Sequence, residues 1–229
     1  MPADDRDITI ALQRAVVGVL LVVLAFVLGI QVVFDADIDL DAWWNSYVEV
    51  FARIRALAFA LNFLGGGWFA GILVPLAGLV ALLAVRRTAA ALLFVTASAA
   101  SAIGVQVMKA IFGRARPEEM LVVSDHGSFP SGHTANAATL AVIAFVLLPR
   151  VWVGVTGVAW VFVMAFSRTQ VHAHWVSDTV GGALAGAGFA LIVAAAFTLP
   201  LARERARFAA ALPAADGARN PQTEAGPRV

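Results

Sequence analysis

The sequence predicts an all-α, polytopic membrane protein with six transmembrane helices and an interfacial amphipathic segment. Hydrophobic residues make up 61% of the 229 residues and charged residues only 14%, and the mean hydropathy is +0.85. This composition leaves too little polar surface for a soluble domain. The apolar residues also gather in runs close to the roughly 20 residues that a helix needs to cross a bilayer. The chain is therefore expected to be an integral membrane protein.

Six apolar runs are candidates for membrane-spanning helices. They cover residues 15–34, 68–85, 89–108, 134–148, 151–166 and 179–199. The fourth and fifth runs are short for a span, so we expect these two helices to extend into the polar residues beside them or to stand nearly upright. The alanines at 97–102 and the glycines at 181–188 are interpreted as sites of close helix packing, because small side chains let helix backbones approach each other.

Arginines at the ends of the runs predict the orientation of the protein. They precede the first run and follow the second, fourth and sixth, at positions 6, 14, 86, 87, 150, 203, 205 and 207. Because basic residues favour the cytoplasmic side, both termini are expected inside and the loops at 35–67, 109–131 and 167–178 outside. This reasoning predicts a bacterial inner or plasma membrane protein whose polar loops face the periplasmic or extracellular side.

The segment from Asp35 to Gly67 begins with acidic residues and continues with aromatic ones. Its composition predicts a segment that lies along the membrane interface, and Gly65, Gly66 and Gly67 are interpreted as a flexible joint before the second span. After residue 201 the chain becomes rich in arginine, alanine and proline. We therefore predict a membrane domain at 1–201 and a disordered cytoplasmic tail at 202–229.

Three polar blocks flank the apolar runs and hold the residues that can take part in catalysis or binding. The first is Lys109 with Arg116-Pro117, and the second is residues 130–133, Pro-Ser-Gly-His. The third contains Ser167-Arg168, His174 and Asp178. Ionisable groups at such positions are costly and usually functional. A net charge of +1 gives no indication of a nucleic-acid partner, so a small anion such as phosphate is the expected ligand of these cations.

Each block also has a purely structural interpretation. Ser131 could cap the helix that follows it, with the first free N–H groups directed at an anion. Asp178 could likewise cap the sixth span. If residues 174–178 are helical, His174 and Asp178 share a face, and the carboxylate could orient the imidazole. Lys109 is the one lysine among 16 lysines and arginines, which favours a specific task over a general one.

The order and spacing of the blocks resemble the type 2 phosphatidic acid phosphatase superfamily. Its pattern is Lys-x6-Arg-Pro, then Pro-Ser-Gly-His, then Ser-Arg-x5-His-x3-Asp, and the chain matches every named position between 109 and 178. Two departures are Val176, where the family often has proline, and His172, where a small residue is common. Neither departure removes a residue of the pattern.

The resemblance implies a role for each matched residue. His174 would be the nucleophile, Asp178 its orienting partner and His133 the general acid. The phosphoryl oxygens would be bound by Lys109, Arg116, Arg168, Ser131 and Gly132. The substrate would be a lipid phosphate monoester or diphosphate, such as undecaprenyl diphosphate, phosphatidylglycerol phosphate or phosphatidic acid, hydrolysed through a phosphohistidine. No metal or other cofactor is implied, since cations and a helix N-terminus can neutralise the transferred group.

Two other functions remain open from the sequence. A metal-dependent hydrolase could use His172, His174 and Asp178 with His133 as ligands, although the nearby cations oppose a bound metal. A transporter could also carry intramembrane charges, but here they gather at one side and no repeat accompanies them. The related vanadium haloperoxidases share the pocket pattern but are soluble, which disfavours that activity.

Overall fold

The computed structural model describes residues 5–34, 39–66 and 68–211, and these residues form helices without strands. The first half contains α1 (Asp5–Phe34), α2 (Asp39–Tyr47), the 3-10 helix η1 (Val48–Ile54), α3 (Arg55–Gly65), the π-helix η2 (Phe69–Leu73) and α4 (Val74–Ala84). The second half contains α5 (Thr88–Phe112), α6 (Gly132–Leu147), α7 (Val151–Gln170), α8 (Val176–Ala196) and α9 (Thr198–Ala211). The predicted all-α membrane architecture is confirmed.

The predicted number of six spans is not confirmed by helix length. Four helices, α1, α5, α7 and α8, are long and apolar enough to cross a membrane. A fifth span results if the bent pair formed by 39–65 and 69–84, with an angle of 42°, is one crossing. Helix α6 is apolar but has only 16 residues. The expectation that the fifth run extends into its polar block is confirmed, since α7 continues through Arg168 to Gln170.

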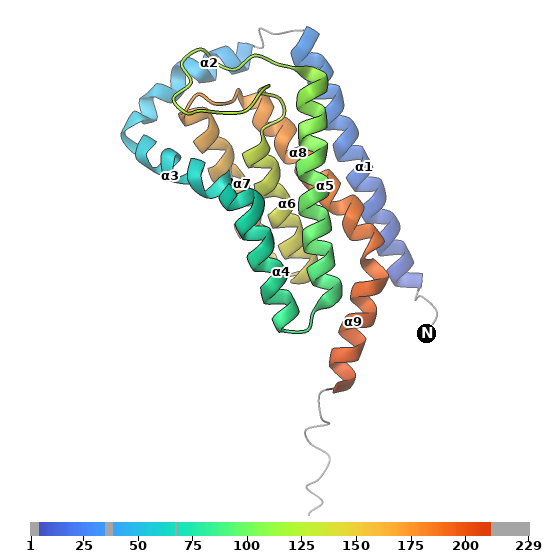
Figure 1. Cartoon of the computed structure of the whole chain (residues 1–229). Helices are drawn as coiled ribbons and strands as arrows, with labels where there is room; N and C mark the ends of the chain where they lie inside the picture. The colour runs from blue at the N-terminus through green and yellow to red at the C-terminus, as the bar shows by residue number, and fades with distance from the viewer. Residues whose placement is uncertain (1–4, 35–38, 67, 212–229) are drawn as a thin grey trace, which may run out of the picture.

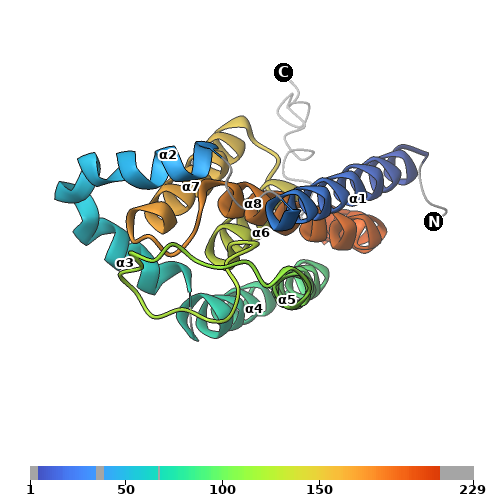
Figure 2. The same ribbon diagram turned by 90° about the horizontal axis from the view of Figure 1, so that it is seen from above.

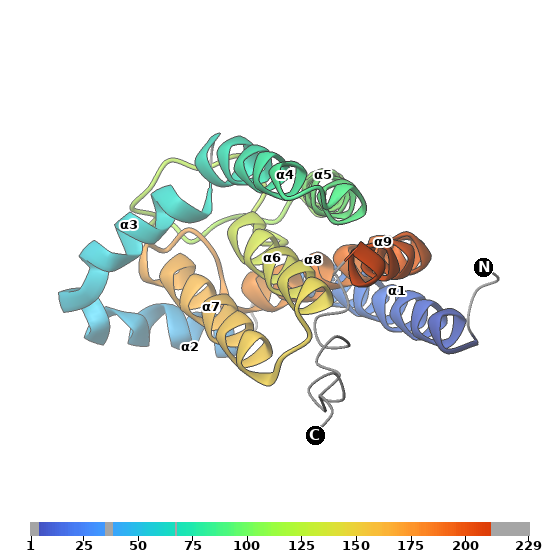
Figure 3. The same ribbon diagram turned by 90° about the horizontal axis from the view of Figure 1, so that it is seen from below.

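Helix α8 lies at the centre of the bundle, packed against α1, α6 and α5 (Figures 1 and 3). The predicted close approach through glycine is confirmed. A side chain on Gly186 would overlap the backbone of Ala135 in α6, and one on Gly182 would overlap the backbone of Ser131. A side chain on Gly18 or Gly188 would likewise overlap atoms of the facing helix where α1 and α8 meet. Most large apolar side chains of α1 are exposed, as expected of a lipid-facing helix.

The polar loops all lie at one end of the bundle. The segment 113–131 and the α7–α8 connection lie there together with α2, whereas the α4–α5 turn and α9 lie at the other end (Figures 1 and 2). Helices α2, η1 and α3 run across this end and contribute a cluster of aromatic rings, in which Trp44 and Phe51 contact Phe166 of α7. The interfacial segment thus forms one side of the polar end.

Two of the sequence predictions extend beyond the described residues. Positions 35–38 and Gly67 belong to the predicted interfacial segment and glycine joint, and positions 212–229 belong to the predicted tail. All of them lie outside the residues that the structure describes. Residues 202–211, which the composition assigns to the tail, are helical and form most of α9.

Candidate active site

The three polar blocks converge at the polar end of the bundle. Lys109 lies in the last turn of α5, Gly132 and His133 begin α6, and His174 follows α7. Together with Asp125 and Ser124 they line a cavity of about 670 Å³. The cavity continues along small and apolar residues of η2, α4 and α5, including Ala70, Pro75, Ala99 and Val105. A polar mouth thus opens onto an apolar hollow between helices.

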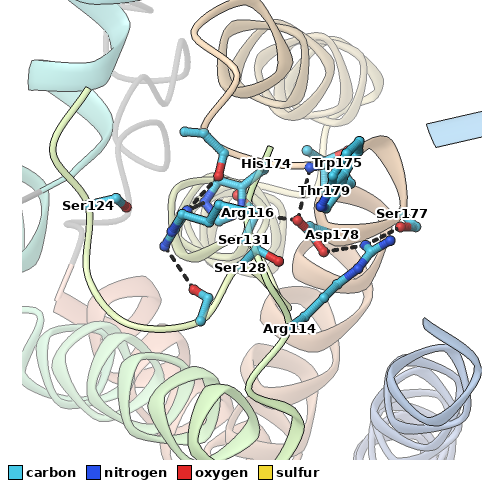
Figure 4. A network of polar contacts seen from close by, with 12 residues as sticks. Arg114, Arg116, Ser124, Ser128, Ser131, His174, Trp175, Ser177, Asp178 and Thr179 are labelled. Atoms are coloured by element: carbon cyan, nitrogen blue, oxygen red, sulfur yellow. Dashed lines mark hydrogen bonds and ion pairs between the residues drawn. The ribbon is translucent and has the colours of Figure 1, made fainter. Parts of the chain in front are cut away.

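His174 is held with its two ring nitrogens in different surroundings (Figure 4). Its Nε2 lies 3.2 Å from Nη1 of Arg116, and its Nδ1 lies 3.5 Å from Oδ2 of Asp178. The guanidinium can only donate, so Nε2 presents a lone pair and the hydrogen belongs on Nδ1. This is the tautomer that a nucleophilic Nε2 requires. The Nδ1 contact is loose, and this buried nitrogen makes no hydrogen bond.

The assumption that His174 and Asp178 share a helical face is wrong. His174 lies in the loop before α8, which begins at Val176. The two side chains meet because Asp178 turns back over the helix start, where its Oδ2 accepts a hydrogen bond from the backbone N–H of Trp175 at 2.9 Å. Asp178 therefore caps the start of α8, as predicted, and the same carboxylate also lies beside Nδ1 of His174.

Burial lowers the pKa of the His174 imidazole from 6.5 to about 4, and the charges of Arg116 and Lys109 act in the same direction. Asp178 opposes this shift by favouring the protonated ring. The side chain of His174 is only 3% exposed, so desolvation of the charged form is the dominant effect. The imidazole is therefore neutral at pH 7, with its lone pair available for reaction.

Two buried residues that sequence analysis did not select hold Asp178 in place. Arg114 donates from Nη1 to Asp178 Oδ1 at 2.7 Å and from Nη2 to Asp41 Oδ2 at 2.9 Å. Asp41 on α2 also accepts hydrogen bonds from the backbone N–H and the hydroxyl of Ser177. Arg114 and Asp41 are at most 8% exposed. The sequence offered one signal for this network, the arginine two positions before Arg116.

His133 and Arg168 are joined through Asn62 of α3, another residue that sequence analysis missed. The backbone oxygen of Asn62 lies 3.1 Å from His133 Nε2, and its side-chain oxygen accepts from Arg168 Nη1 at 2.9 Å. Arg168 is fully buried, and its Nε has no hydrogen-bond partner. Gly66 packs directly on His133, where a side chain would overlap the imidazole. Close approach therefore accounts for the described glycines 65 and 66.

Ser131 occupies the capping position of α6 with extended backbone angles, but its side chain makes no capping hydrogen bond. The hydroxyl instead accepts from Thr134 Oγ1 at 3.2 Å, and its backbone N–H donates to the carbonyl oxygen of Asp178. The side-chain cap predicted for Ser131 is therefore wrong. A backbone bond to Asp178 ties the start of α6 to the start of α8.

His172 does not face the cavity. Its Nδ1 lies 2.7 Å from Asn45 Oδ1 and its Nε2 lies 2.7 Å from Glu49 Oε1, both on the segment that precedes α3. The metal alternative requires His172 beside His174, and the structure directs the two rings to different partners. Within 5–34, 39–66 and 68–211, no three His, Asp or Glu side chains gather as metal ligands do.

The sequence pattern of the PAP2 superfamily matches residues 89–200. This region contains all three polar blocks. This region of the chain belongs to the PAP2 superfamily.

Two solved structures share this PAP2 fold. One is a transmembrane PAP2-type phosphatidylglycerolphosphate phosphatase from Bacillus subtilis, with a TM-score of 0.69 and 22% identity over 77% of this chain and 94% of that one. The other is LpxE of Aquifex aeolicus, with a TM-score of 0.53 and 24% identity over 62% of this chain and 85% of that one. At these identities the likeness concerns the fold.

One curated relative is a lipid A 4'-phosphatase of Bacteroides thetaiotaomicron. It is 34% identical over 58 residues, which is 25% of this PAP2 chain and 26% of the relative. The match therefore spans about a quarter of the relative's length.

Proposed function

We propose that this PAP2 protein is an integral membrane lipid phosphatase that transfers a phosphoryl group first to His174 and then to water. The observation that supports it most strongly is the orientation of His174. Its Nε2 faces Arg116, a cation suited to a phosphoryl oxygen, while Asp178 lies at the other ring nitrogen. A neutral imidazole held this way can attack phosphorus.

In the first step Nε2 of His174 forms a bond to phosphorus, and the bond between phosphorus and the lipid oxygen breaks. His133 lines the same cavity and, in its protonated form, donates a proton to the departing oxygen. Lys109, Arg116 and Arg168, with Ser131 and the N–H of Gly132, bind the equatorial oxygens. Such catalysis consists mainly of positioning and charge neutralisation. Asp178 stabilises the positive charge that develops on His174. Water then attacks phosphorus and gives a proton to His133, while the bond between phosphorus and Nε2 breaks and inorganic phosphate leaves.

The cavity favours a lipid as the leaving group. Its polar mouth holds the histidines, and its continuation between η2, α4 and α5 is lined mainly by small side chains, most of them apolar. A lipid tail can stay in this hollow or in the bilayer while the headgroup reaches His174. Undecaprenyl diphosphate, phosphatidylglycerol phosphate and phosphatidic acid all fit this description. The charge pattern supports an active site on the periplasmic or extracellular side of a bacterial inner membrane.

Phosphate release from a panel of these purified lipids, in detergent, tests the proposal. Wild-type protein should release phosphate, and His174→Ala should reduce turnover by several orders of magnitude. His126→Ala is the matched control, because His126 is an exposed histidine of the 113–131 segment. Quenching with alkaline detergent after adding labelled substrate should trap phosphate on His174, because phosphohistidine is stable in base and labile in acid. Near-normal hydrolysis by His174→Ala would disprove the assignment of the nucleophile.

The same assay distinguishes the metal-dependent alternative that uses His172, His174 and Asp178. Activity should persist in excess EDTA, because the three cations already neutralise the phosphoryl group. A soluble phosphate ester should be included as substrate, so that effects of magnesium on lipid presentation are separated from effects on the enzyme. Loss of activity with EDTA that zinc or magnesium restores would favour the metal-dependent mechanism.

A further inference from the structure

A carboxylate from the protein itself occupies the cations that the proposed function assigns to phosphate. Oδ1 of Asp125 lies 2.9 Å from Lys109 Nζ and 2.8 Å from Arg116 Nη2. Its other oxygen accepts from Gln106 Nε2 at 3.2 Å. One oxygen atom thus bridges a lysine and an arginine, as a phosphoryl oxygen would.

The neighbouring backbone completes this internal ligand. The carbonyl oxygen of Gly127 accepts from Lys109 Nζ at 2.9 Å and from Arg116 Nη2 at 2.8 Å. Arg116 also donates to the carbonyl oxygen of Asp125 from Nε and Nη2. Most donors of Lys109 and Arg116 are therefore already satisfied. An incoming phosphate must displace Asp125 to reach them.

Asp125 also fixes the position of Arg116 relative to the nucleophile. Asp125 binds Nη2 of the Arg116 guanidinium. Nη1 of the same group lies 3.2 Å from His174 Nε2. In this arrangement Arg116 covers the nitrogen that would attack phosphorus. We call the form in which Asp125 binds Lys109 and Arg116 closed, and the form in which these cations are free of it open. Even in the closed form the side chain of Asp125 is 47% exposed. It can therefore swing into solvent without breaking the packed core.

We propose that Asp125 is an internal competitor for the phosphate site, whose carboxylate occupies Lys109 and Arg116 between turnovers and helps to expel product phosphate. This inference rests on the proposed function for the identity of the anion. Burial would raise the pKa of Asp125, but the hydrogen bond and charge of Lys109 lower it below its ordinary value, with Gln106 and Arg116 contributing. The carboxylate is therefore ionised at neutral pH and able to compete.

The competition has a quantitative consequence. A ligand that binds only the open form has its apparent affinity reduced by the fraction of protein that is open. Removing the negative charge of Asp125 should depopulate the closed form and strengthen the binding of phosphate. If the closed form outnumbers the open form by roughly ten to one, the gain in affinity is roughly tenfold.

The test is inhibition of purified wild-type and Asp125→Asn protein by inorganic phosphate. We expect the inhibition constant to fall by roughly tenfold in Asp125→Asn, with a parallel fall in KM. Asp125→Ala should shift both constants in the same direction. Glu118→Gln is the matched control, since it removes one charge from the same segment at an exposed position and should leave both constants unchanged.

An inhibition constant that is unchanged or higher in Asp125→Asn, in protein with wild-type melting temperature, would overturn the inference. That outcome would make Asp125 a support for the two cations. Isothermal titration with inorganic phosphate keeps the inference separate from the proposed function. If wild type hydrolysed no lipid phosphate, the proposed function would fail. A gain in phosphate affinity in Asp125→Asn would still support the inference, and its absence would refute it.

Discussion

At the scale of single residues, the site combines the neutral imidazole of His174 with several buried charges that have defined partners. His174 has a pKa near 4 because its ring is buried among cations. Asp178 stays at its side because Arg114 and the backbone of Trp175 both bind the carboxylate. A change at Asp178 should therefore also affect folding, because it would leave the buried Arg114 without one of its two carboxylate partners.

The lowered pKa of His174 predicts how stability depends on pH. The folded-state pKa is about 4 and the ordinary value is 6.5, so between these values the unfolded chain binds more protons. Stability contributed by this site should therefore fall as the pH falls from 6.5 towards 4. Melting temperatures of wild type and His174→Gln over this range measure the effect. The prediction fails if acidification destabilises both proteins equally.

Arg114 should act as a positioning residue, and Arg114→Lys should expose that role. Lysine keeps the charge but cannot reach Asp41, Ser177 and Asp178 together as the planar fork does. Loss of one hydrogen bond to a charged group costs about 1.5–3 kcal/mol, which is about tenfold or more in rate if it falls on the transition state. We expect a fall in kcat with little change in KM, measured by steady-state kinetics.

Arg53→Lys provides the control for this substitution, since Arg53 is exposed on η1. It should behave as wild type. If Arg114→Lys raised KM and left kcat intact, Arg114 would instead be part of substrate binding.

At the scale of helices, the contact between α6 and α8 positions both halves of the site. Ser131, Gly132 and His133 begin α6, and Asp178 begins α8. The backbone bond from Ser131 to Asp178 requires the two helices to meet closely. Gly182 and Gly186 allow this approach, because a side chain at either position would overlap the backbone of α6.

Gly186→Ala should therefore both destabilise the protein and impair the site. Alanine favours a helix by about 1 kcal/mol over glycine, but overpacking against Ala135 should cost more, about 1–3 kcal/mol. A melting curve and an activity assay measure the two effects. Gly71→Ala in η2 is the control, since no atom lies within 4 Å of the added carbon. Equal stability of the two variants would refute the packing argument.

At the scale of the whole molecule, the fold separates a polar end that carries the site from an opposite end with the α4–α5 turn and α9 (Figure 1). The arginines cluster towards the second end. Arg87 there pairs with Glu204 at 2.9 Å, and Arg14 donates to Thr198. By the positive-inside rule, this charge distribution predicts a cytoplasmic location for that end.

Cysteine labelling tests this orientation in a chain that has no cysteine of its own. A cysteine at Ser124, exposed beside the cavity, should react with a membrane-impermeant maleimide in intact cells. A cysteine at Ala210, exposed in α9, should react only after the membrane is permeabilised. The reverse pattern would place hydrolysis on the cytoplasmic leaflet and contradict the proposed outer-leaflet substrate.

The sequence by itself determined that this protein lies in a membrane and is helical, and it identified the candidate residues Lys109, His133 and His174. Hydropathy and motif spacing are local properties, so they can be obtained without coordinates. The number of spans was harder to predict from the sequence, because the bend between α3 and α4 and the shortness of α6 depend on packing. The sequence also suggested that His174 and Asp178 lie on one helix, whereas the structure places His174 in the loop before α8 and Asp178 in its first turn.

Only the tertiary structure decided how the charges are paired. Asp41 lies more than 130 residues before Ser177 and Asp178 in the chain, yet Arg114 and Ser177 both bind it. Asn62 joins His133 to Arg168 in the same way. Asp125 had no distinguishing pattern, and its place on Lys109 and Arg116 follows from the path of the 113–131 segment. Pairing between distant segments depends on how the helices pack, and no local pattern in the sequence encodes it.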